Sequence, residues 1–325
     1  MASTCKGCWR QVITELMAID SAPGNASTPA RVAVLLAAYE GRVWIEAQLA
    51  SVLAQVGVAV DVYISVDPSN DGTQAWCTTF ASANPNVILL PPAGRFGGAA
   101  RNFFRLIRDV DVAAYDYVAF CDQDDVWYQG KLERAVAVLQ RGQIEGYSSN
   151  VVAFWEDGRR ALVQKAQPQV KWDHLFEAAG PGCTYVLHSN LITAFKALLV
   201  AQWDEVQHID LHDWFCYAFA RSRGYAWFID PVPSLDYRQH ERNQVGVNSG
   251  VAPAVARWRK IADGWWFSQA QRTASVLGIE NPFINAEGRI AWLKLATHVN
   301  VCRRRARDRA VMFVACLVNA VSARR

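Results

Sequence analysis

The chain has 325 residues, of which 52% are hydrophobic and 19% charged, and its formal net charge is +3. This length and composition exclude a disordered chain and a minimal scaffold, and they predict one large domain, or a nucleotide-binding half with a smaller half. Because the net charge is small, the charge balance gives no support to nucleic acid as a partner.

The first 29 residues contain a weakly amphipathic stretch and then a segment rich in Ser, Pro and Ala, which indicates a tail and a linker. From residue 30 to about residue 140, short apolar runs alternate with segments of helical spacing. This alternation predicts parallel strands with helices on both faces, a doubly wound sheet. The predicted elements, in chain order, are Val32–Ala38, helix Val43–Gln55, Val60–Val66, helix Asp71–Phe80, Val87–Leu90, a helix containing Arg101–Ile107, and Tyr117–Cys121.

Ligands of such sheets bind outside the carboxyl ends of the strands, where the loops gather. Three loops that follow predicted strands are rich in polar residues, at 38–41, 67–73 and 122–125. We therefore expect polar side chains from all three loops to meet at one edge of the sheet. Beyond residue 150 the pattern predicts mixed strands and helices to about residue 248, and a mostly helical region from 249 to 325.

The densest polar loop contains Asp122, Asp124 and Asp125, directly after an apolar strand. Carboxylates packed this closely repel one another and raise each other's pKa values unless a cation neutralises them. Hard oxygen ligands suit Mg²⁺ or Mn²⁺, and such an ion pairs naturally with a diphosphate. The alternative is an acidic turn whose Asp residues cap the next helix, around Gln129–Gln140.

The whole set of motifs, in this order, resembles glycosyltransferase family 2, and most closely its rhamnosyltransferase-like branch. The resemblance covers about residues 31–248, and several dispersed motifs in order are more specific than any one of them. The residues that carry it are Ala37-Ala38-Tyr39-Glu40-Gly41, Trp44-Ile45, Gln48-Leu49, the run from Ser65 to Thr73, Gly98, Asn102-Phe103, Asp122-Gln123-Asp124-Asp125-Val126-Trp127, Gly182-Cys183-Thr184, His212-Asp213-Trp214, Tyr237-Arg238-Gln239-His240 and Asn243.

The resemblance implies a GT-A fold, with a Rossmann-like, mostly parallel sheet flanked by helices, and an inverting, metal-dependent transfer of a sugar. It implies a dTDP- or UDP-linked donor, with L-rhamnose suggested by the branch, and a saccharide or lipid-linked saccharide acceptor in bacterial surface polysaccharide synthesis. The implied divisions are a tail (1–29), a GT-A domain (30–248) with a nucleotide-sugar-binding half (30–140) and an acceptor half (141–248), and a helical region (249–325).

Roles carry over to the positions that match the family's motifs. Asp124 matches the direct metal ligand, with Asp122 and His240 as further ligands, although a solvated surface histidine is the alternative for His240. The matched donor-nucleotide positions are Ala38, Tyr39, Glu40, Asp67, Asn102, Asp122 and Gln123. The supporting residues are Asp125, Trp127 and Arg238, and those on the acceptor side are Gly182, Cys183, His212 and Trp214. For Trp127, a place in the core is the alternative to stacking on a sugar.

Asp213 matches the family's general base. Inversion by direct displacement needs a group that takes the proton of the acceptor hydroxyl while its oxygen attacks the anomeric carbon. The apolar and aromatic residues that follow Asp213 predict a desolvated carboxylate with a raised pKa. The alternative is that Asp213 is the N-cap of a helix over Trp214–Ala220.

The eight cysteines lack the dense spacing of a secreted disulfide scaffold, and no signal peptide or run of about 18 to 20 apolar residues is present. These features predict reduced thiols and a cytoplasmic protein. Near the C-terminus, a cluster of arginines at 303–309 precedes an apolar stretch at 310–318. This composition favours either a helix lying on the anionic cytoplasmic face of the inner membrane or a helix packed on the domain.

Two other classes of protein share parts of this pattern. A dinucleotide-dependent oxidoreductase also has a doubly wound sheet, but it needs GxGxxG after the first strand, where this chain has Ala38-Tyr39-Glu40-Gly41-Arg42. A non-catalytic carbohydrate-binding protein of the same fold is the second, and the retained Asp124 and Asp213 argue against it.

Overall fold

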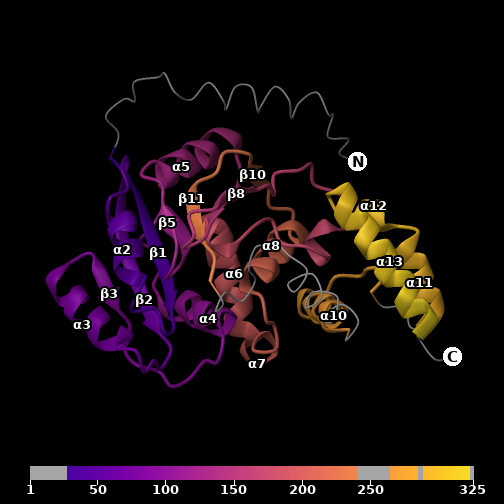
Figure 1. The fold of residues 1–325 in the computed structure, drawn as a ribbon, viewed down its shortest axis with the longest axis horizontal. Coiled ribbons are helices and arrows are strands. Elements are labelled where there is room, and N and C mark those ends of the chain that lie inside the picture. Colours follow the sequence, from indigo (N-terminus) through magenta and orange to yellow (C-terminus); the bar gives the residue numbers. More distant parts are fainter. Residues whose placement is uncertain (1–27, 241–263, 285–287, 323–325) are drawn as a thin grey trace.

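The computed structural model describes residues 28–240, 264–284 and 288–322 (Figure 1). The predicted tail up to residue 27, Asn243 and the start of the C-terminal region up to residue 263 lie outside the described residues. A seven-stranded sheet has the order β10-β6-β9-β4-β1-β2-β3, with every strand parallel to the others except β9. The strands are β1 (Ala30–Ala38), β2 (Val58–Val66), β3 (Val87–Leu89), β4 (Tyr117–Asp122), β6 (Gly146–Ser149), β9 (Val186–His188) and β10 (Trp227–Asp230).

Helices cover both faces of this sheet, as the alternating pattern predicts (Figure 1). Along β1, Ala33 and Leu35 join one hydrophobic cluster while Val32, Val34 and Leu36 join the other. A strand buried on both faces must be apolar at every position, which explains the unbroken apolar run. The helices of the first cluster are α4 (Ala99–Asp109), α6 (Ser189–Ala201) and α8 (His212–Ser222), with the short α7 (Trp203–Val206) after α6; those of the second are α2 (Ile45–Leu53), α3 (Thr73–Ala83) and α5 (Lys131–Gly142).

A second, four-stranded sheet lies next to the acidic loop, in the order β5-β11-β7-β8. Its β5 follows that loop immediately, and β11 pairs with β5 in antiparallel register, with Asp236 opposite Val126. The end of β11 therefore runs back alongside the loop that contains Asp124. The strands are β5 (Val126–Trp127), β7 (Val151–Phe154), β8 (Arg160–Val163) and β11 (Leu235–Arg238).

The described part of the C-terminal region is helical, as predicted, and it packs on the domain through a third cluster that includes Phe176 and Trp214. Buried charges also join the two parts. Arg304 lies 3.3 Å from Asp173, and both side chains are almost completely buried. The elements are the 3-10 turn η2 (Asp173–Leu175) on the domain, and α10 (Trp265–Leu277), α11 (Gly288–Ala296), α12 (Val299–Cys302) and α13 (Ala306–Ser322), of which α11 to α13 lie at the yellow end of Figure 1.

Candidate functional site

The three polar loops meet at one edge of the main sheet, as the sequence predicts. Ala38 at the end of β1 pairs with Val66 at the end of β2, and Ala37 pairs with Asp122 at the end of β4. The loops that leave these three strands therefore begin side by side. Sheet register alone places the acidic loop next to the loops that start at Tyr39 and Asp67.

Hydrogen bonds lock the loop after β1 to its neighbours. Gln123 accepts the backbone N–H of Tyr39 at 2.8 Å and donates to its carbonyl at 2.7 Å. On the other side, the Glu40 carboxylate accepts the backbone N–H of Asn70 at 2.7 Å. Gly41 packs so closely that a Cβ there would lie 2.0 Å from the Gln123 side chain. The Tyr39 side chain remains 46% exposed, and its ring is available to stack on a planar ligand.

Three of the residues matched to the nucleotide are buried and bonded within the protein. Asp67 is 4% exposed, and its carboxylate oxygens accept the backbone N–H groups of Phe96 and Gly97 at 2.8 and 2.9 Å. Asn102 donates to the Ser65 carbonyl at 3.0 Å. Ala38 is also buried, and its carbonyl accepts the Asp67 N–H at 2.8 Å. These contacts hold the loops around the site, and direct contact of the three with a nucleotide stays a prediction.

The three carboxylates of the acidic loop have different surroundings. Burial, with the charges of Asp124 and Asp213, raises the pKa of Asp122 to about 7. Burial also raises the pKa of Asp125 well above its usual value; one carboxylate oxygen accepts the N–H of Arg238 at 3.1 Å, and the other has no hydrogen-bond partner among the described residues. One ligand atom each from Asp122, Asp125 and Cys183 lies within 4.8 Å of the others. A divalent cation bound by this cluster would offset the repulsion between its carboxylates.

The alternative that these aspartates cap the following helix is wrong. The strand β5 comes between the acidic loop and α5, and the residue at the N-cap of α5 is Gly130.

Asp124 is joined to the end of β11, as its antiparallel pairing with β5 requires. The Nε2 atom of His240 lies 2.7 Å from a carboxylate oxygen of Asp124, and Arg238 donates from Nε to the Asp124 carbonyl at 2.8 Å. The imidazole of His240 stacks on Trp44 with ring centroids 4.1 Å apart, and only 10% of its side chain is exposed. His240 is thus held at the acidic loop and is not a solvated surface histidine.

The predicted acceptor-side residues Gly182, Cys183 and His212 lie together with Asp213. The 3-10 turn η3 (Gly182–Thr184) packs on the start of α8 so closely that a Cβ on Gly182 would lie 2.7 Å from the Nε2 atom of His212. Burial lowers the pKa of His212 to about 3, so its imidazole is neutral, and its Nε2 atom has no hydrogen-bond partner among the described residues.

Asp213 lies in the first turn of α8. Its carboxylate accepts the backbone N–H of Trp214 at 2.7 Å, and burial raises its pKa to about 6. The helix begins at His212 with Leu211 as its N-cap, so the N-cap alternative for Asp213 is wrong. A carboxylate with this pKa is ionised at neutral pH and still has a substantial affinity for a proton, as a general base requires.

The two tryptophans among the predicted site residues are buried. Trp214 is 4% exposed, donates to the His174 carbonyl at 2.9 Å and belongs to the third cluster, so it points towards the C-terminal helices. Trp127 is 3% exposed and belongs to the second cluster, which is the core alternative for this residue. Neither side chain is placed to stack on a sugar in this structure.

Comparisons with known proteins decide the family. Residues 33–199 match the model of glycosyl transferase family 2. The chain is also 41% identical over 288 residues to the dTDP-rhamnosyl transferase RfbG of Shigella flexneri, which covers 87% of this chain and 99% of that protein. The chain belongs to glycosyltransferase family 2. Its resemblance to the rhamnosyltransferase-like branch is thereby confirmed, and the oxidoreductase and non-catalytic alternatives are set aside.

Other similarities extend over less of the chain or show the fold alone. The glycosyltransferase is 24% identical over 176 residues to the Escherichia coli UDP-Glc:alpha-D-GlcNAc-diphosphoundecaprenol beta-1,3-glucosyltransferase WfgD, across 53% of this chain and 66% of that one. The crystal structure of S. aureus TarS 1-349 in complex with UDP superposes with a TM-score of 0.52 at 12% identity, covering 90% of this chain and 88% of that one. This likeness confirms the expected GT-A fold.

Two lysines near the site of this glycosyltransferase have no counterpart among the predicted site residues. Lys131, the first residue of α5, is 2% exposed, and its ammonium donates to the carbonyl of Cys183. The charge of Lys165 lowers the pKa of Asp213, partly opposing the effect of burial. In sequence, both lysines belong to segments with no local signal of a site, so only their positions near the carboxylates in the folded chain identify them.

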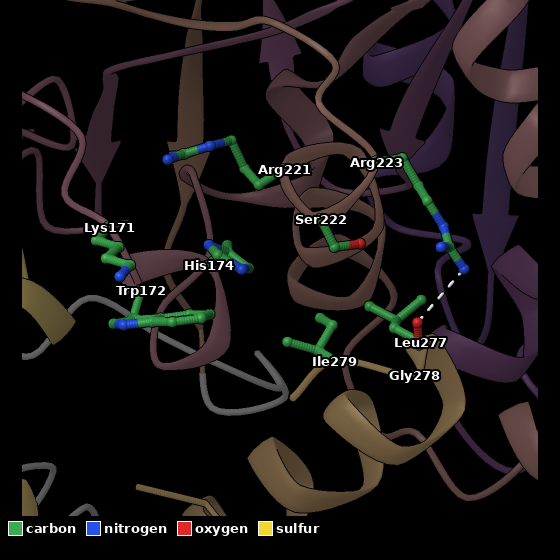
Figure 2. A pocket seen from close by; sticks show the side chains of 9 residues that line it. All are labelled: Lys171, Trp172, His174, Arg221, Ser222, Arg223, Leu277, Gly278 and Ile279. Carbon is green, nitrogen blue, oxygen red and sulfur yellow. Dashed lines mark hydrogen bonds between the residues drawn. The ribbon is translucent and has the colours of Figure 1, made fainter. Parts of the chain in front are cut away.

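A cavity of about 380 Å³ lies at the other end of α8 from Asp213 (Figure 2). It is lined by Trp172, His174, Arg221, Arg223 and Ile279, among others, and by none of the predicted site residues. Arg221 binds the carboxylate of Asp173 at 3.0 Å, and Arg223 donates to the Leu277 carbonyl at 3.4 Å, the dashed line in Figure 2. The cavity is separate from the glycosyltransferase site, because it lies at the far end of α8 and no predicted site residue lines it.

Proposed function

We propose that this glycosyltransferase moves L-rhamnose, with inversion, from a dTDP-linked donor to a saccharide or lipid-linked saccharide, and that a UDP-sugar is the alternative donor. The identity of 41% to a dTDP-rhamnosyl transferase supports the donor. The observation that carries the chemistry is the convergence of Asp124, His240 and the half-buried Asp122 at the sheet edge, with Asp213 close enough to raise the pKa of Asp122. In this proposal the carboxylates bind the metal ion and the neighbouring Asp213 is the base.

The residues present fit a divalent cation. Asp124 and His240 supply an oxygen and a nitrogen ligand at 2.7 Å from each other, and Asp125 has a buried carboxylate oxygen without a hydrogen-bond partner among the described residues. Such a donor set suits Mn²⁺ or Mg²⁺, and the imidazole nitrogen makes Mn²⁺ the metal to test first. The ion, when bound, stabilises the negative charge on the departing diphosphate.

The remaining steps fall to side chains of this chain. Tyr39, at the exposed end of its locked loop, would stack on the nucleobase, and Glu40 and Gln123 hold that loop in place. Asp213 takes the proton of the acceptor hydroxyl while the acceptor oxygen bonds to the anomeric carbon and the bond to the diphosphate breaks. His212 and Gly182, packed against Asp213, shape the side from which the acceptor approaches.

The experiment that tests the function is a thermal-shift screen followed by a transfer assay. The purified protein is heated with dTDP, UDP, GDP, CMP or NAD⁺, with and without Mn²⁺, because a ligand that binds the folded state raises its stability. We expect a metal-dependent rise of the melting temperature with dTDP or UDP, and release of dTDP from dTDP-rhamnose with an acceptor. A response to NAD⁺ alone, or to no nucleotide, would contradict the proposal.

We also propose that the C-terminal helices rest on an anionic membrane surface. One side of α13 packs into the third cluster through Met312 and Cys316. The opposite side of the helix faces outward, so packing on the domain does not prevent contact with a membrane. That outer face, with one side of α11, carries seven apolar side chains that are 38% to 79% exposed, and exposed arginines stand at the start of α13. The seven are Ile290, Leu293, Phe313, Val314, Leu317, Val318 and Val321.

An exposed apolar face beside basic residues is typical of a helix that lies in the membrane surface at the level of the lipid headgroups. No helix in the described ranges is long and apolar enough to span a bilayer. Such contact would place the active site near lipid-linked acceptors at the cytoplasmic face of the inner membrane.

Replacing Leu317 and Val318 together by Glu is expected to weaken binding to phosphatidylserine-containing vesicles at least about tenfold. The change removes two exposed apolar side chains that would enter the membrane, and it adds negative charge that the anionic lipids repel. Co-sedimentation with vesicles measures the effect. Val200→Glu is the matched control, because Val200 on α6 is 53% exposed and lies away from this face, so its substitution should have no effect. Absence of vesicle binding by the unmodified protein, or a dimer that buries this face, would overturn the proposal.

A further inference from the structure

Lys131 is a buried cation next to the acidic cluster. Its side chain is 2% exposed, its Nζ atom lies 3.2 Å from the centroid of the Trp127 ring, and it donates to the carbonyl of Cys183 in η3. No carboxylate lies within 4 Å of its ammonium in the part of the chain that the structure describes. Burying an ammonium without an ion pair is costly, so charge at longer range must offset the loss of hydration.

Carboxylates of the acidic loop lie close to this ammonium, because Cys183, whose carbonyl it contacts, has its Sγ atom within 4.8 Å of a carboxylate oxygen of Asp122 and of Asp125. Burial lowers the pKa of Lys131 to about 8, and the neighbouring Cys183 and Cys121, followed by Asp125 and Asp122, act in the opposite direction and favour the ammonium. The effect is reciprocal, since the Lys131 charge lowers the pKa of Asp122 against the larger effect of burial. The ammonium and the two carboxylates therefore stabilise one another's charged forms.

We propose that Lys131 is a positioning residue of the donor site, whose ammonium neutralises the acidic cluster when no metal is bound and whose hydrogen bond holds η3 against that cluster. The inference rests on the proposed function, because it concerns the same carboxylates. It links the two halves of the site, since Lys131 begins the helix after the acidic loop and Cys183 lies beside the acceptor-side residues Gly182 and His212. Lys131 and the metal ion thus act on the same negative charge.

The test compares thermal unfolding of Lys131→Met with that of the unmodified protein, with and without Mn²⁺. We expect the metal-free variant to melt about 5 °C or more below the unmodified protein, because the buried Asp125 and the half-buried Asp122 lose a nearby positive charge. Mn²⁺ should then raise its melting temperature by more than it raises that of the unmodified protein. Lys196→Met is the matched control, since Lys196 also donates to a carbonyl, that of Val110 at 2.6 Å, and should leave the Mn²⁺ response unchanged.

A double variant keeps the inference testable if Lys131→Met folds poorly. Asp125→Asn combined with Lys131→Met removes one charge of each sign, and it should melt well above Lys131→Met alone. Additive losses in the metal-free double variant, or an equal Mn²⁺ response of Lys131→Met and the unmodified protein, would overturn the role of Lys131. If the unmodified protein shows no response to Mn²⁺, the metal site of the proposed function fails, while the metal-free double variant still decides the role of Lys131.

Discussion

Asp213→Asn is expected to lower kcat by about 10²- to 10⁴-fold, the usual contribution of a general base. The amide has nearly the shape of the carboxylate and can still accept the N–H of Trp214, so the fold and the affinity for dTDP with Mn²⁺ should stay close to those of the unmodified protein. Transfer is measured as dTDP release with an acceptor, and nucleotide affinity by titration. Asp204→Asn, on the exposed surface of α7, is the control and should change neither quantity.

Because the pKa of Asp213 is raised, kcat/KM should fall as the pH is lowered. The base must be ionised to take a proton, and burial places its pKa at about 6. As the pH falls through 6, the ionised fraction falls, so kcat/KM should decrease towards tenfold per pH unit below this value and level off above it. A kcat/KM that is constant from pH 5 to pH 8, or full activity of Asp213→Asn, would refute the assignment of Asp213 as the base.

Asp124→Asn is expected to abolish the Mn²⁺-dependent stabilisation by dTDP or UDP and to lower the transfer rate at least about 10²-fold. The substitution removes the charge that faces His240 at 2.7 Å while keeping the side-chain volume. A neutral amide is a weaker ligand for a hard divalent ion, and the departing diphosphate then loses several kcal/mol of electrostatic stabilisation. Thermal shifts with a Mn²⁺ titration and the transfer assay measure the two effects.

Two comparisons make the Asp124 result specific. Asp111→Asn changes an exposed aspartate in the loop before β4, and it should leave both the Mn²⁺ response and the transfer rate unchanged. His240→Ala should weaken Mn²⁺ binding while leaving the acidic loop in place. Equal Mn²⁺ responses of Asp124→Asn and the unmodified protein would show that the metal binds elsewhere.

The amino-acid sequence by itself determined the sheet and the edge at which the site lies. An unbroken apolar run such as Val32–Ala38 predicts a strand covered on both faces, and the alternation of such runs with helical segments predicts parallel crossovers. Polar residues directly after those runs must then meet at the carboxyl ends, where Tyr39 and Asp122 lie. These features depend on local periodicity and on a general rule of sheet topology, so they are readable without coordinates.

Only the tertiary structure decided which side chains face one another. His240 and Asp124 are 116 residues apart, and they meet because β11 pairs with β5 in antiparallel register. Trp214 adjoins Asp213 in sequence but points into the third cluster, since neighbouring residues of a helix project in different directions. The proposed role of Lys131 likewise depends on its burial and on its hydrogen bond to the carbonyl of Cys183, 52 residues away. Register, helix rotation and burial arise from packing across the whole chain, and local sequence patterns do not contain them.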